Sequence, residues 1–243
     1  MRLTILGEAE TDWAEALAER FRAAGHTVVA GDVGADHRPS DVQLADALAT
    51  SDACIDVCVV DRARKAAALA LADRHLPPSR PLWSCCLATS ATYVAASVEH
   101  PARVFGFSLL PPWAGRTTVE CARALQAADS DAGAAAAVWT AIDLAPVWVA
   151  DGTALVLGRI VCCLANEAAF ALMERTAGGA DIDTAMRLGT RYPRGPIEWA
   201  NTVGPRVVVA VLDALAAEHG EDRYRVAPLL RRHAAAGLPL PLG

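Results

Sequence analysis

A short apolar run, Leu3 to Leu6, ends at Gly7, and an apolar segment with helical spacing follows it. A second apolar run then ends near Asp32. A glycine turn between a strand and a helix offers backbone N–H groups to an anion, and an acidic residue after the next strand can bind a ribose hydroxyl. The residue types and their spacing therefore predict a dinucleotide site, with cofactor contacts at Gly7 and Asp32.

The same turn departs from the glycine-rich pattern of such sites. It reads Gly-Glu-Ala-Glu-Thr-Asp, so Ala9 stands where the backbone would approach a pyrophosphate closely. Glu8, Glu10 and Asp12 bring three carboxylates to the start of the following helix, where they complement its dipole and repel a phosphate. Two interpretations of Asp32 stay open, a retained cofactor contact and a solvated carboxylate in a strand-end turn.

Cysteine is a second residue type with reactive chemistry. The chain has seven cysteines, and Cys85-Cys86 and Cys162-Cys163 are adjacent pairs. No C-x-x-C pair and no His/Cys cluster with zinc spacing occurs, which argues against a metal centre. Cys85 and Cys86 end an apolar run, so they are either a nucleophilic pair or buried small residues in a reducing compartment. No histidine is placed by the sequence to activate them, and His100 before a proline reads as a surface side chain.

Strands and helices alternate over residues 1–150. The predicted strands are short and apolar, and cover residues 3–6, 27–30, 53–60, 82–86, 104–107, 118–121 and 147–149. The predicted helices between them cover residues 13–24, 41–49, 62–75, 92–98 and 132–143. This alternation predicts an α/β, Rossmann-like domain with a doubly wound parallel sheet and a degenerate nucleotide turn.

No strand is predicted after residue 150. Apolar residues recur there with helical spacing over residues 154–175, 182–188, 197–202, 206–219 and 227–236. The sequence therefore predicts two domains, a degenerate NAD-binding domain of residues 1–150 and an all-α domain of residues 151–243.

Composition and charge exclude several classes of protein. The chain is 53% hydrophobic and 21% charged, so it can build a sizeable core. A formal net charge of −6 argues against a nucleic-acid surface. No charged leader and no apolar run long enough to span a membrane is visible. We expect a cytoplasmic protein that binds neither nucleic acid nor a membrane.

The stretch from Asp181 to Gly204 carries the most specific motif of the chain. It combines D-I-D-T-A-M-R-L-G with Y-P-R-G-P, in which the prolines fix φ and Gly195 permits backbone angles that other residues resist. The motif resembles that of the 3-hydroxyacyl-CoA dehydrogenases, whose helical C-terminal domain carries D-I-D-x-A-M-x-x-G-x-x-Y-P-x-G-P. Further matches to this family are Arg159, Asn166-Glu167-Ala168, residues 220–225 and residues 228–232.

The chain resembles in particular the C-terminal module of two-module bacterial phenylacetate-type 3-hydroxyacyl-CoA dehydrogenases, in which the Rossmann-like portion is reduced. This resemblance implies NAD-linked oxidation of 3-hydroxyacyl-CoA to 3-oxoacyl-CoA, in fatty-acid β-oxidation or in aromatic acyl-CoA catabolism. It also implies an acyl-CoA ligand, NAD as the cofactor and a homodimer formed through the helical domain. The apolar faces of residues 154–175 and 207–215 are the predicted dimer contact.

Active members of this family use a Ser, a His, a Glu twelve residues after the His, and an Asn. The His takes the hydroxyl proton as hydride leaves, and the Glu orients that His. In this chain the resemblance places Ser108 at the His position, Glu120 at the Glu position and Gly158 at the Asn position. It places Leu87 at the Ser position, where a shift of one or two residues stays open. Ser108 and Glu120 are therefore the candidate catalytic residues, although Glu120 is equally interpreted as an ordinary strand-end carboxylate.

The only lysine, Lys65, aligns with a family lysine near the cofactor and the CoA. It is a candidate cofactor-binding residue, and a solvated helix lysine is the alternative. Two functions then compete. One is an NAD-linked oxidoreductase, and the other is a catalytically inactive acyl-CoA-binding or scaffold homologue that assists a paralogous active dehydrogenase. Because serine at its ordinary pKa is no base near neutral pH, residue chemistry favours the second and overall resemblance favours the first.

Overall fold

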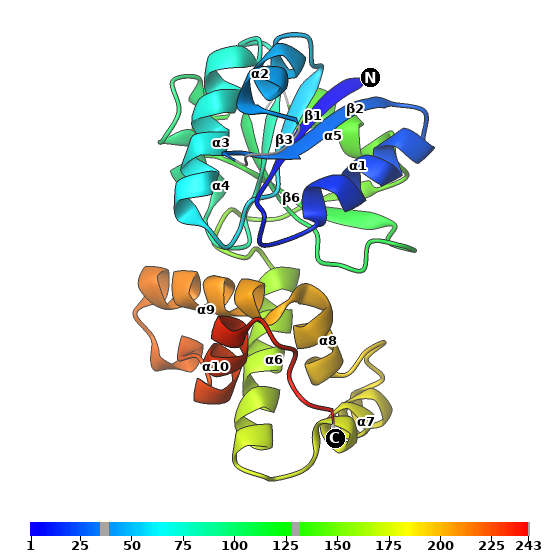
Figure 1. Cartoon of the computed structure of the whole chain (residues 1–243), viewed down its shortest axis with the longest axis vertical. Helices are drawn as coiled ribbons and strands as arrows, with labels where there is room; N and C mark the ends of the chain where they lie inside the picture. The colour runs from blue at the N-terminus through cyan, green and yellow to red at the C-terminus, as the bar shows by residue number, and fades with distance from the viewer. Residues whose placement is uncertain (35–38, 128–131, 243) are drawn as a thin grey trace. The chain divides into compact units, whose positions relative to one another are not determined.

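Figure 1 shows the computed structural model, which describes residues 1–34, 39–127 and 132–242. The chain forms two compact units. The sheet unit comprises Met1–Leu109 and Gly115–Leu155, and the helical unit comprises Leu110–Ala114 and the residues from Val156 onward. The predicted boundary after residue 150 lies shortly before this division. The short segment Leu110–Ala114, which lies between two strands, groups with the helical unit.

The sheet unit is built on one seven-stranded sheet with the strand order β2-β1-β3-β4-β5-β6-β7. The strands are β1 (Arg2–Gly7), β2 (Thr27–Asp32), β3 (Ala53–Asp56), β4 (Leu82–Cys85), β5 (Val104–Ser108), β6 (Thr118–Arg123) and β7 (Ala145–Trp148). The predicted doubly wound sheet is confirmed, with one correction. β6 runs antiparallel to β5, because residues 109–117 are too short for the crossover that a parallel pair needs.

Helices cover both faces of this sheet, as Figure 1 shows. They are α1 (Trp13–Ala23), α2 (Asp41–Ala49), α3 (Arg62–His75), α4 (Ala91–Ala95) and α5 (Ala132–Thr140), with a short 3₁₀ helix, η1 (Pro101–Arg103). On one face, α2, α3 and α4 contribute to an aliphatic core. On the other face, Phe21 of α1 and Trp139 of α5 pack on each other, and Trp139 also contacts Trp83 and Phe107 of the sheet. Burial of these apolar faces fixes the strand ends at the edge described below.

The helical unit contains α6 (Leu157–Met173), α7 (Gly179–Thr190), α8 (Pro196–Val203), α9 (Pro205–His219), the 3₁₀ helix η3 (Asp222–Tyr224) and α10 (Pro228–Ala236). The predicted all-α domain is confirmed. Helix α6 contacts α7, α8, α9 and α10. The expectation that this helix begins at Ala154 is wrong by one turn. Ala154 and Leu155 have φ values of 67° and 48°, which are left-handed, so the helix begins only at Leu157.

The Y-P-R-G-P turn joins α7 to α8 through a buried carboxylate. Asp183 of α7 is 4% exposed and accepts hydrogen bonds from the N–H groups of Ile197 at 2.7 Å and Glu198 at 2.9 Å. These are N–H groups of the first turn of α8, which have no partner within the helix. A Cβ at Gly195 would lie 2.1 Å from Cγ of Asp183, so only glycine fits there. The motif is therefore a device that caps one helix from another.

Across the part of the chain that the structure describes, no single helix has both the length and the apolar character needed to cross a membrane. Helices α8 and α9 taken together meet that test by length and composition alone, and they are bent by 97° at their junction.

Candidate functional site

The carboxyl ends of β1, β2, β3 and β4 meet at one edge of the sheet, because these strands are parallel. We call this edge, with the turns that follow the four strands, the carboxyl edge. The chain passes from β1 to β2 on one side and later returns to β3 on the other side of β1. In such sheets a ligand binds in the crevice where the strand order reverses. That crevice lies between the ends of β1 and β3.

Gly7 and Asp32, the two predicted cofactor contacts at the strand ends, lie together. They are register partners in β1 and β2. A Cβ at Gly7 would lie 2.6 Å from Cβ of Ala14 and 2.9 Å from Oδ1 of Asp32, so glycine allows α1 to approach the strand closely. Asp32 is partly exposed and lines a small cavity of about 170 Å³ together with Thr11 and Asp12. This arrangement suits the adenosine end of a dinucleotide, and the contact itself stays a prediction.

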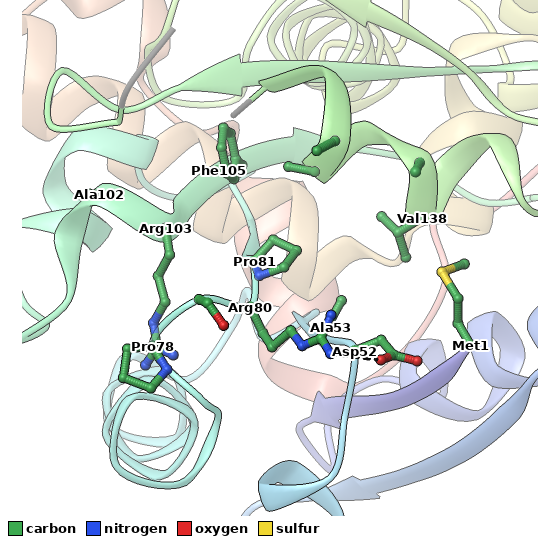
Figure 2. Close-up of a pocket in the computed structure, with 14 residues that line it drawn as sticks. Met1, Asp52, Ala53, Pro78, Arg80, Pro81, Ala102, Arg103, Phe105 and Val138 are labelled. Carbon is green, nitrogen blue, oxygen red and sulfur yellow. Dashed lines mark ion pairs between the residues drawn. The ribbon is translucent and has the colours of Figure 1, made fainter. Parts of the chain in front are cut away.

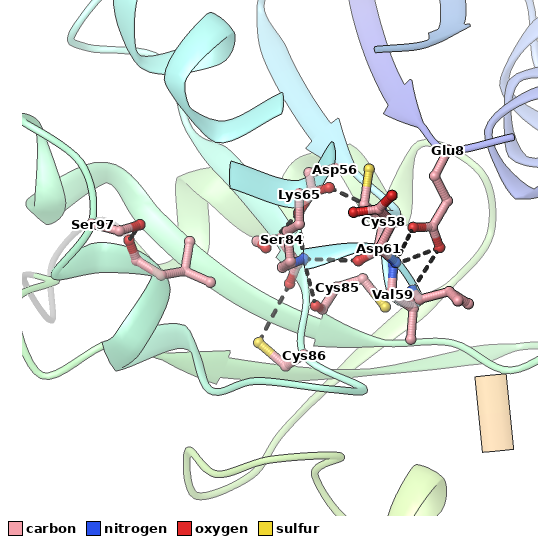
Figure 3. Close-up of polar contacts among 12 residues, drawn as sticks. Glu8, Asp56, Cys58, Val59, Asp61, Lys65, Ser84, Cys85, Cys86 and Ser97 are labelled. Atoms are coloured by element: carbon pink, nitrogen blue, oxygen red, sulfur yellow. Dashed lines mark hydrogen bonds and ion pairs between the residues drawn. The ribbon is translucent and has the colours of Figure 1, made fainter. Parts of the chain in front are cut away.

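Glu8 lies on the other side of the turn and is fully buried. Its carboxylate accepts hydrogen bonds from the backbone N–H groups of Val59 and Val60, each at 2.8 Å, and of Asp61 at 2.9 Å (Figure 3). Burial raises the pKa of Glu8 above its ordinary value, and the three N–H donors act in the opposite direction. The prediction that Glu8 complements the dipole of α1 is wrong for this residue, because its side chain reaches the start of α3 instead.

Further charge surrounds Glu8 at the carboxyl edge. Oε2 of Glu10 is buried and lies 3.9 Å from Nε of Arg64, which is also 3.7 Å from Oδ2 of Asp61. Three carboxylates and one guanidinium leave the local charge negative. A dinucleotide brings two more negative charges to this place. The residues therefore fit a dinucleotide at the adenosine end of the crevice and oppose it at the pyrophosphate end.

Lys65 is the centre of a buried polar network (Figure 3). Its Nζ donates to Oδ2 of Asp56 at 2.6 Å and to the carbonyl oxygens of Cys58 and Cys85, each at 3.0 Å. The hydroxyl of Ser84 donates to the same Oδ2 at 2.7 Å. The side chain of Lys65 is 12% exposed, so the interpretation as a solvated helix lysine is wrong.

All three ammonium donors of Lys65 are engaged within the protein. Burial alone would lower the pKa of Lys65, and the carboxylate of Asp56 raises it overall, so the ammonium stays charged. A cofactor contact by Lys65 stays a prediction, and it would have to replace one of these bonds. Sequence reasoning missed Asp56, because an acid inside an apolar strand gave no sign of its partner nine residues later.

The thiols at the carboxyl edge are core side chains. Cys85 is 1% exposed and Cys86 is fully buried. Burial raises the pKa of Cys85 to about 12, so the thiol is protonated at neutral pH. A Cβ at Gly106 would lie 2.6 Å from Sγ of Cys86, which shows how closely that sulfur is packed. These positions favour the interpretation as buried small residues over that as a nucleophilic pair. Over the described residues no group of His, Cys, Asp and Glu could hold a metal ion.

Ser108 and Glu120, the candidate catalytic residues, are register partners in the antiparallel pair β5–β6. Side chains of such partners lie on one face, with Cβ atoms about 4.5–5.5 Å apart. Ser108 is 1% exposed, and its hydroxyl has no hydrogen-bond partner within the described chain. Glu120 is half-buried. Because this hydroxyl has no partner, it makes no hydrogen bond to Glu120, and a proton relay between the two side chains would require that bond to form.

Leu87 and Gly158, which the resemblance places at the Ser and Asn positions, carry no side chain that could transfer a proton. Leu87 is fully buried in the sheet unit, and Gly158 lies in the first turn of α6 in the helical unit. His100 is paired within the sheet unit, with Nδ1 3.1 Å from Oδ1 of Asp73. Ser108 and Glu120 are neighbours across β5 and β6, and their catalytic role stays a prediction.

A larger cavity, of about 760 Å³, opens at the opposite end of the strands (Figure 2). Its charged lining is already paired. Arg80 lies 3.5 Å from Oδ1 of Asp52, and Arg103 donates to Asp73 and to the carbonyl oxygens of Leu76 and Pro77. These bonds fix the end of α3 to η1. The cavity thus gives no chemical role to the residues around it.

Comparison with known proteins adds to this geometry. Residues 155–239 match the family model described as "3-hydroxyacyl-CoA dehydrogenase, C-terminal domain". A probable 3-hydroxybutyryl-CoA dehydrogenase of Bacillus subtilis is 28% identical over 201 residues, which are 83% of this chain and 70% of that protein. The 3-hydroxyadipyl-CoA dehydrogenase of Escherichia coli is 42% identical over 86 residues, which are 35% of this chain and 18% of that protein.

Among solved structures, the (S)-3-hydroxybutyryl-CoA dehydrogenase of Ralstonia eutropha is similar over 98% of this chain and 94% of its own. The TM-score is 0.76 and the sequence identity 24%, so this likeness concerns the fold.

Proposed function

Since the chain belongs to the 3-hydroxyacyl-CoA dehydrogenase family, we propose that it is an oxidoreductase that interconverts 3-hydroxyacyl-CoA and 3-oxoacyl-CoA. The observation that carries the proposal is the register pairing of Ser108 with Glu120. NAD, when bound, would accept the hydride, and Gly7 and Asp32 are the residues that would hold its adenosine end. Fatty-acid or aromatic acyl-CoA catabolism is the setting that fits such a reaction.

In this proposal the Ser108 hydroxyl takes the proton of the ligand hydroxyl and passes its own proton to the carboxylate of Glu120. Charge balances, because the serine gains one proton and gives up one, so that it ends as a neutral hydroxyl, and the net result is one proton moved from the ligand to Glu120. The ordinary pKa of a glutamate lies about two pH units below that of a histidine, so a carboxylate is the weaker base. We therefore expect turnover about a hundredfold slower than with an imidazole base at this place.

Reduction of acetoacetyl-CoA by NADH tests the proposal. Glu120→Gln should abolish turnover, because an amide accepts no proton at neutral pH. Glu99→Gln, which removes a charge from an exposed side chain of the same unit, is the matched control and should leave turnover unchanged. Absence of turnover together with absence of NADH binding at millimolar cofactor would remove the oxidoreductase.

A second candidate function is that of an acyl-CoA-binding or scaffold homologue that assists a paralogous dehydrogenase without turnover of its own. The observation that favours it is the carboxylate of Glu8 at the pyrophosphate end of the crevice. Calorimetric titration with acetoacetyl-CoA would show binding in this case, while no NADH is consumed. A measured turnover that Glu120→Gln abolishes would exclude this candidate.

A homodimer through the helical unit is part of the proposal. The contact predicted for residues 207–215 stays a prediction, for which Val209 and Ala210 are the partly exposed apolar side chains, while the other apolar members are buried, namely Val207, Val208, Val211, Leu212, Ala214 and Leu215. Val156 and Ile160 at the start of α6 are 49% and 52% exposed, so they are apolar side chains that a dimer contact could bury. Light scattering should give twice the chain mass, and a mass near 25.4 kDa would contradict the dimer.

A cytoplasmic location is also proposed. Its support is that all seven cysteines are free, and six of them are buried. Unpaired thiols of this number are typical of a reducing compartment.

A further inference from the structure

Glu8 connects the two sides of the crevice at which the strand order reverses. It follows Gly7 at the end of β1, and it accepts its three hydrogen bonds from Val59, Val60 and Asp61, which lead from β3 into α3. Figure 3 shows the carboxylate directed at this segment. The donors that the segment could offer to a phosphate on this side of the crevice are therefore already used by a side chain of the protein.

Helix α3 does not need Glu8 for its cap. The carboxylate of Asp61 already accepts from the N–H groups of Ala63 at 2.8 Å and Arg64 at 3.1 Å. Glu8 is a second acid at the same helix start, and it comes from the opposite side of the crevice. Its contribution to helix capping alone does not account for a fully buried carboxylate in this position.

We infer that Glu8 is the residue that sets the nucleotide affinity of this chain, because its carboxylate holds the donors and the charge position that a pyrophosphate would take. The inference rests on the NAD-linked function proposed above. A dinucleotide then binds weakly to the unmodified chain, since it must displace Glu8 from its three donors and approach Glu10 as well. Neutralising Glu8 removes the repulsion while the side chain keeps its size.

Titration of NADH fluorescence tests this inference directly, without any turnover. Glu8→Gln should tighten NADH binding by about tenfold or more, as expected when one like charge is removed within a few ångström of a phosphate. Glu19→Gln is the matched control, because Glu19 is an exposed acid on α1, the helix that follows the same turn. It should bind NADH as the unmodified chain does. Thermal unfolding of each variant checks that the fold is kept.

The outcomes separate the inference from the function on which it rests. Tight NADH binding that is equal in the unmodified chain and in Glu8→Gln would overturn the inference and leave the NAD-linked function standing. Failure of both proteins to bind at millimolar NADH would overturn both. A second measurement needs no variant. The amide NMR signals of Val59, Val60 and Asp61 should shift with saturating NADH, because their acceptor changes from the carboxylate of Glu8 to a phosphate, and unchanged signals would count against displacement of Glu8.

Discussion

Two buried carboxylates in this chain each accept hydrogen bonds from backbone N–H groups, but they lie in different surroundings. Asp183 in the helical unit accepts from backbone N–H groups in the first turn of α8, and Glu8 in the sheet unit accepts from backbone N–H groups of the segment that leads into α3. Asp183 lies in a packed turn where Gly195 makes room for it. Glu8 crosses the crevice at which this type of sheet binds ligands. Asp183 therefore stabilises the packing of its own unit, whereas Glu8 occupies N–H donors that could otherwise bind a ligand.

The difference extends to the residues around each cap. In the helical unit the polar side chains that match the family join elements of that unit. Asn166 donates to the carbonyl of Arg225 at 3.0 Å and accepts from the N–H of Ala227 at 2.8 Å, and Arg159 donates to the Tyr224 hydroxyl. These contacts fix helix packing. The motif that identifies the family is therefore evidence for packing, while the evidence for chemistry has to come from the carboxyl edge of the sheet.

Lys65→Met gives the largest expected effect on this comparison. It would leave the buried carboxylate of Asp56 without its cation, which costs about 4 kcal/mol in the free energy of unfolding. Denaturant unfolding measures this cost, and Arg62→Met, an exposed position on the same helix, should change it little. If Lys65→Met kept full stability and lost NADH binding instead, this part of the carboxyl edge would be a ligand site and the contrast with the helical unit would fail.

Gly195→Ala should give the second largest loss in the free energy of unfolding. The added methyl would lie 2.1 Å from Cγ of Asp183, so α7 and α8 must move apart, at a cost of about 3 kcal/mol. Gly189→Ala is the matched control, because nothing lies within 4 Å of its added methyl and alanine favours the helix. Thermal melting should separate the two variants clearly. Equal melting temperatures would mean that the turn is loose and that the motif has some role other than packing.

The order of elements could be predicted from the sequence, because apolar periodicity changes at each turn signal. Helices α2 and α3 begin and end at the predicted residues, where Ser40 and Asp61 cap them. The start of α6 could not be predicted, since the left-handed φ of Ala154 and Leu155 belongs to residues that rarely adopt it. The antiparallel β6 follows from the shortness of residues 109–117, which was visible in the sequence.

The site was harder to predict than the fold, because its partners come from distant segments. The sequence places Glu8 beside α1, and only the folded sheet brings the start of α3 closer to it. It places Lys65 on a polar helix face, yet the side chain reaches inward to Asp56. Gly7, Asp32, Ser108 and Glu120 lie at the strand ends that alternation predicts. What could not be predicted is which charges those positions would face.

Asp183→Ala and Glu8→Gln allow the two carboxylates to be compared by the free energy of unfolding that each substitution costs. It would leave the N–H groups of Ile197 and Glu198 without an acceptor in a buried turn, which lowers the free energy of unfolding by about 2 kcal/mol. Glu8→Gln should cost less, since the amide oxygen still accepts from α3. A loss on Glu8→Gln as large as that on Asp183→Ala would show that the sheet unit depends on its cap as the helical unit does.

The smallest expected effect is the pH dependence of stability at Glu8. Burial raises the pKa of Glu8 above its ordinary value of 4.5, so the folded chain holds this proton more tightly than the unfolded chain does. Above pH 4.5 the folded state therefore binds more protons at this group, and stability falls as pH rises toward the raised pKa. Glu8→Gln lacks the titrating group, so it should gain stability relative to the unmodified chain over that window.

In acid, the titration of Asp73 lowers stability, whereas that of Glu8 raises it. Asp73 is present in both the unmodified chain and Glu8→Gln. Burial raises its pKa, but the N–H of Glu99, Arg103 and His100 together lower it overall, so its contribution to stability is lost as pH falls below the ordinary value of an aspartate. The difference between Glu8→Gln and the unmodified chain cancels this shared effect. Denaturant midpoints from pH 4 to pH 8 measure the difference. A difference that stays constant with pH would mean that Glu8 has the same pKa in the folded and unfolded chain. Its charge would then be as stable among the three donors as it is in water. The electrostatic reason for treating Glu8 differently from Asp183 would be lost.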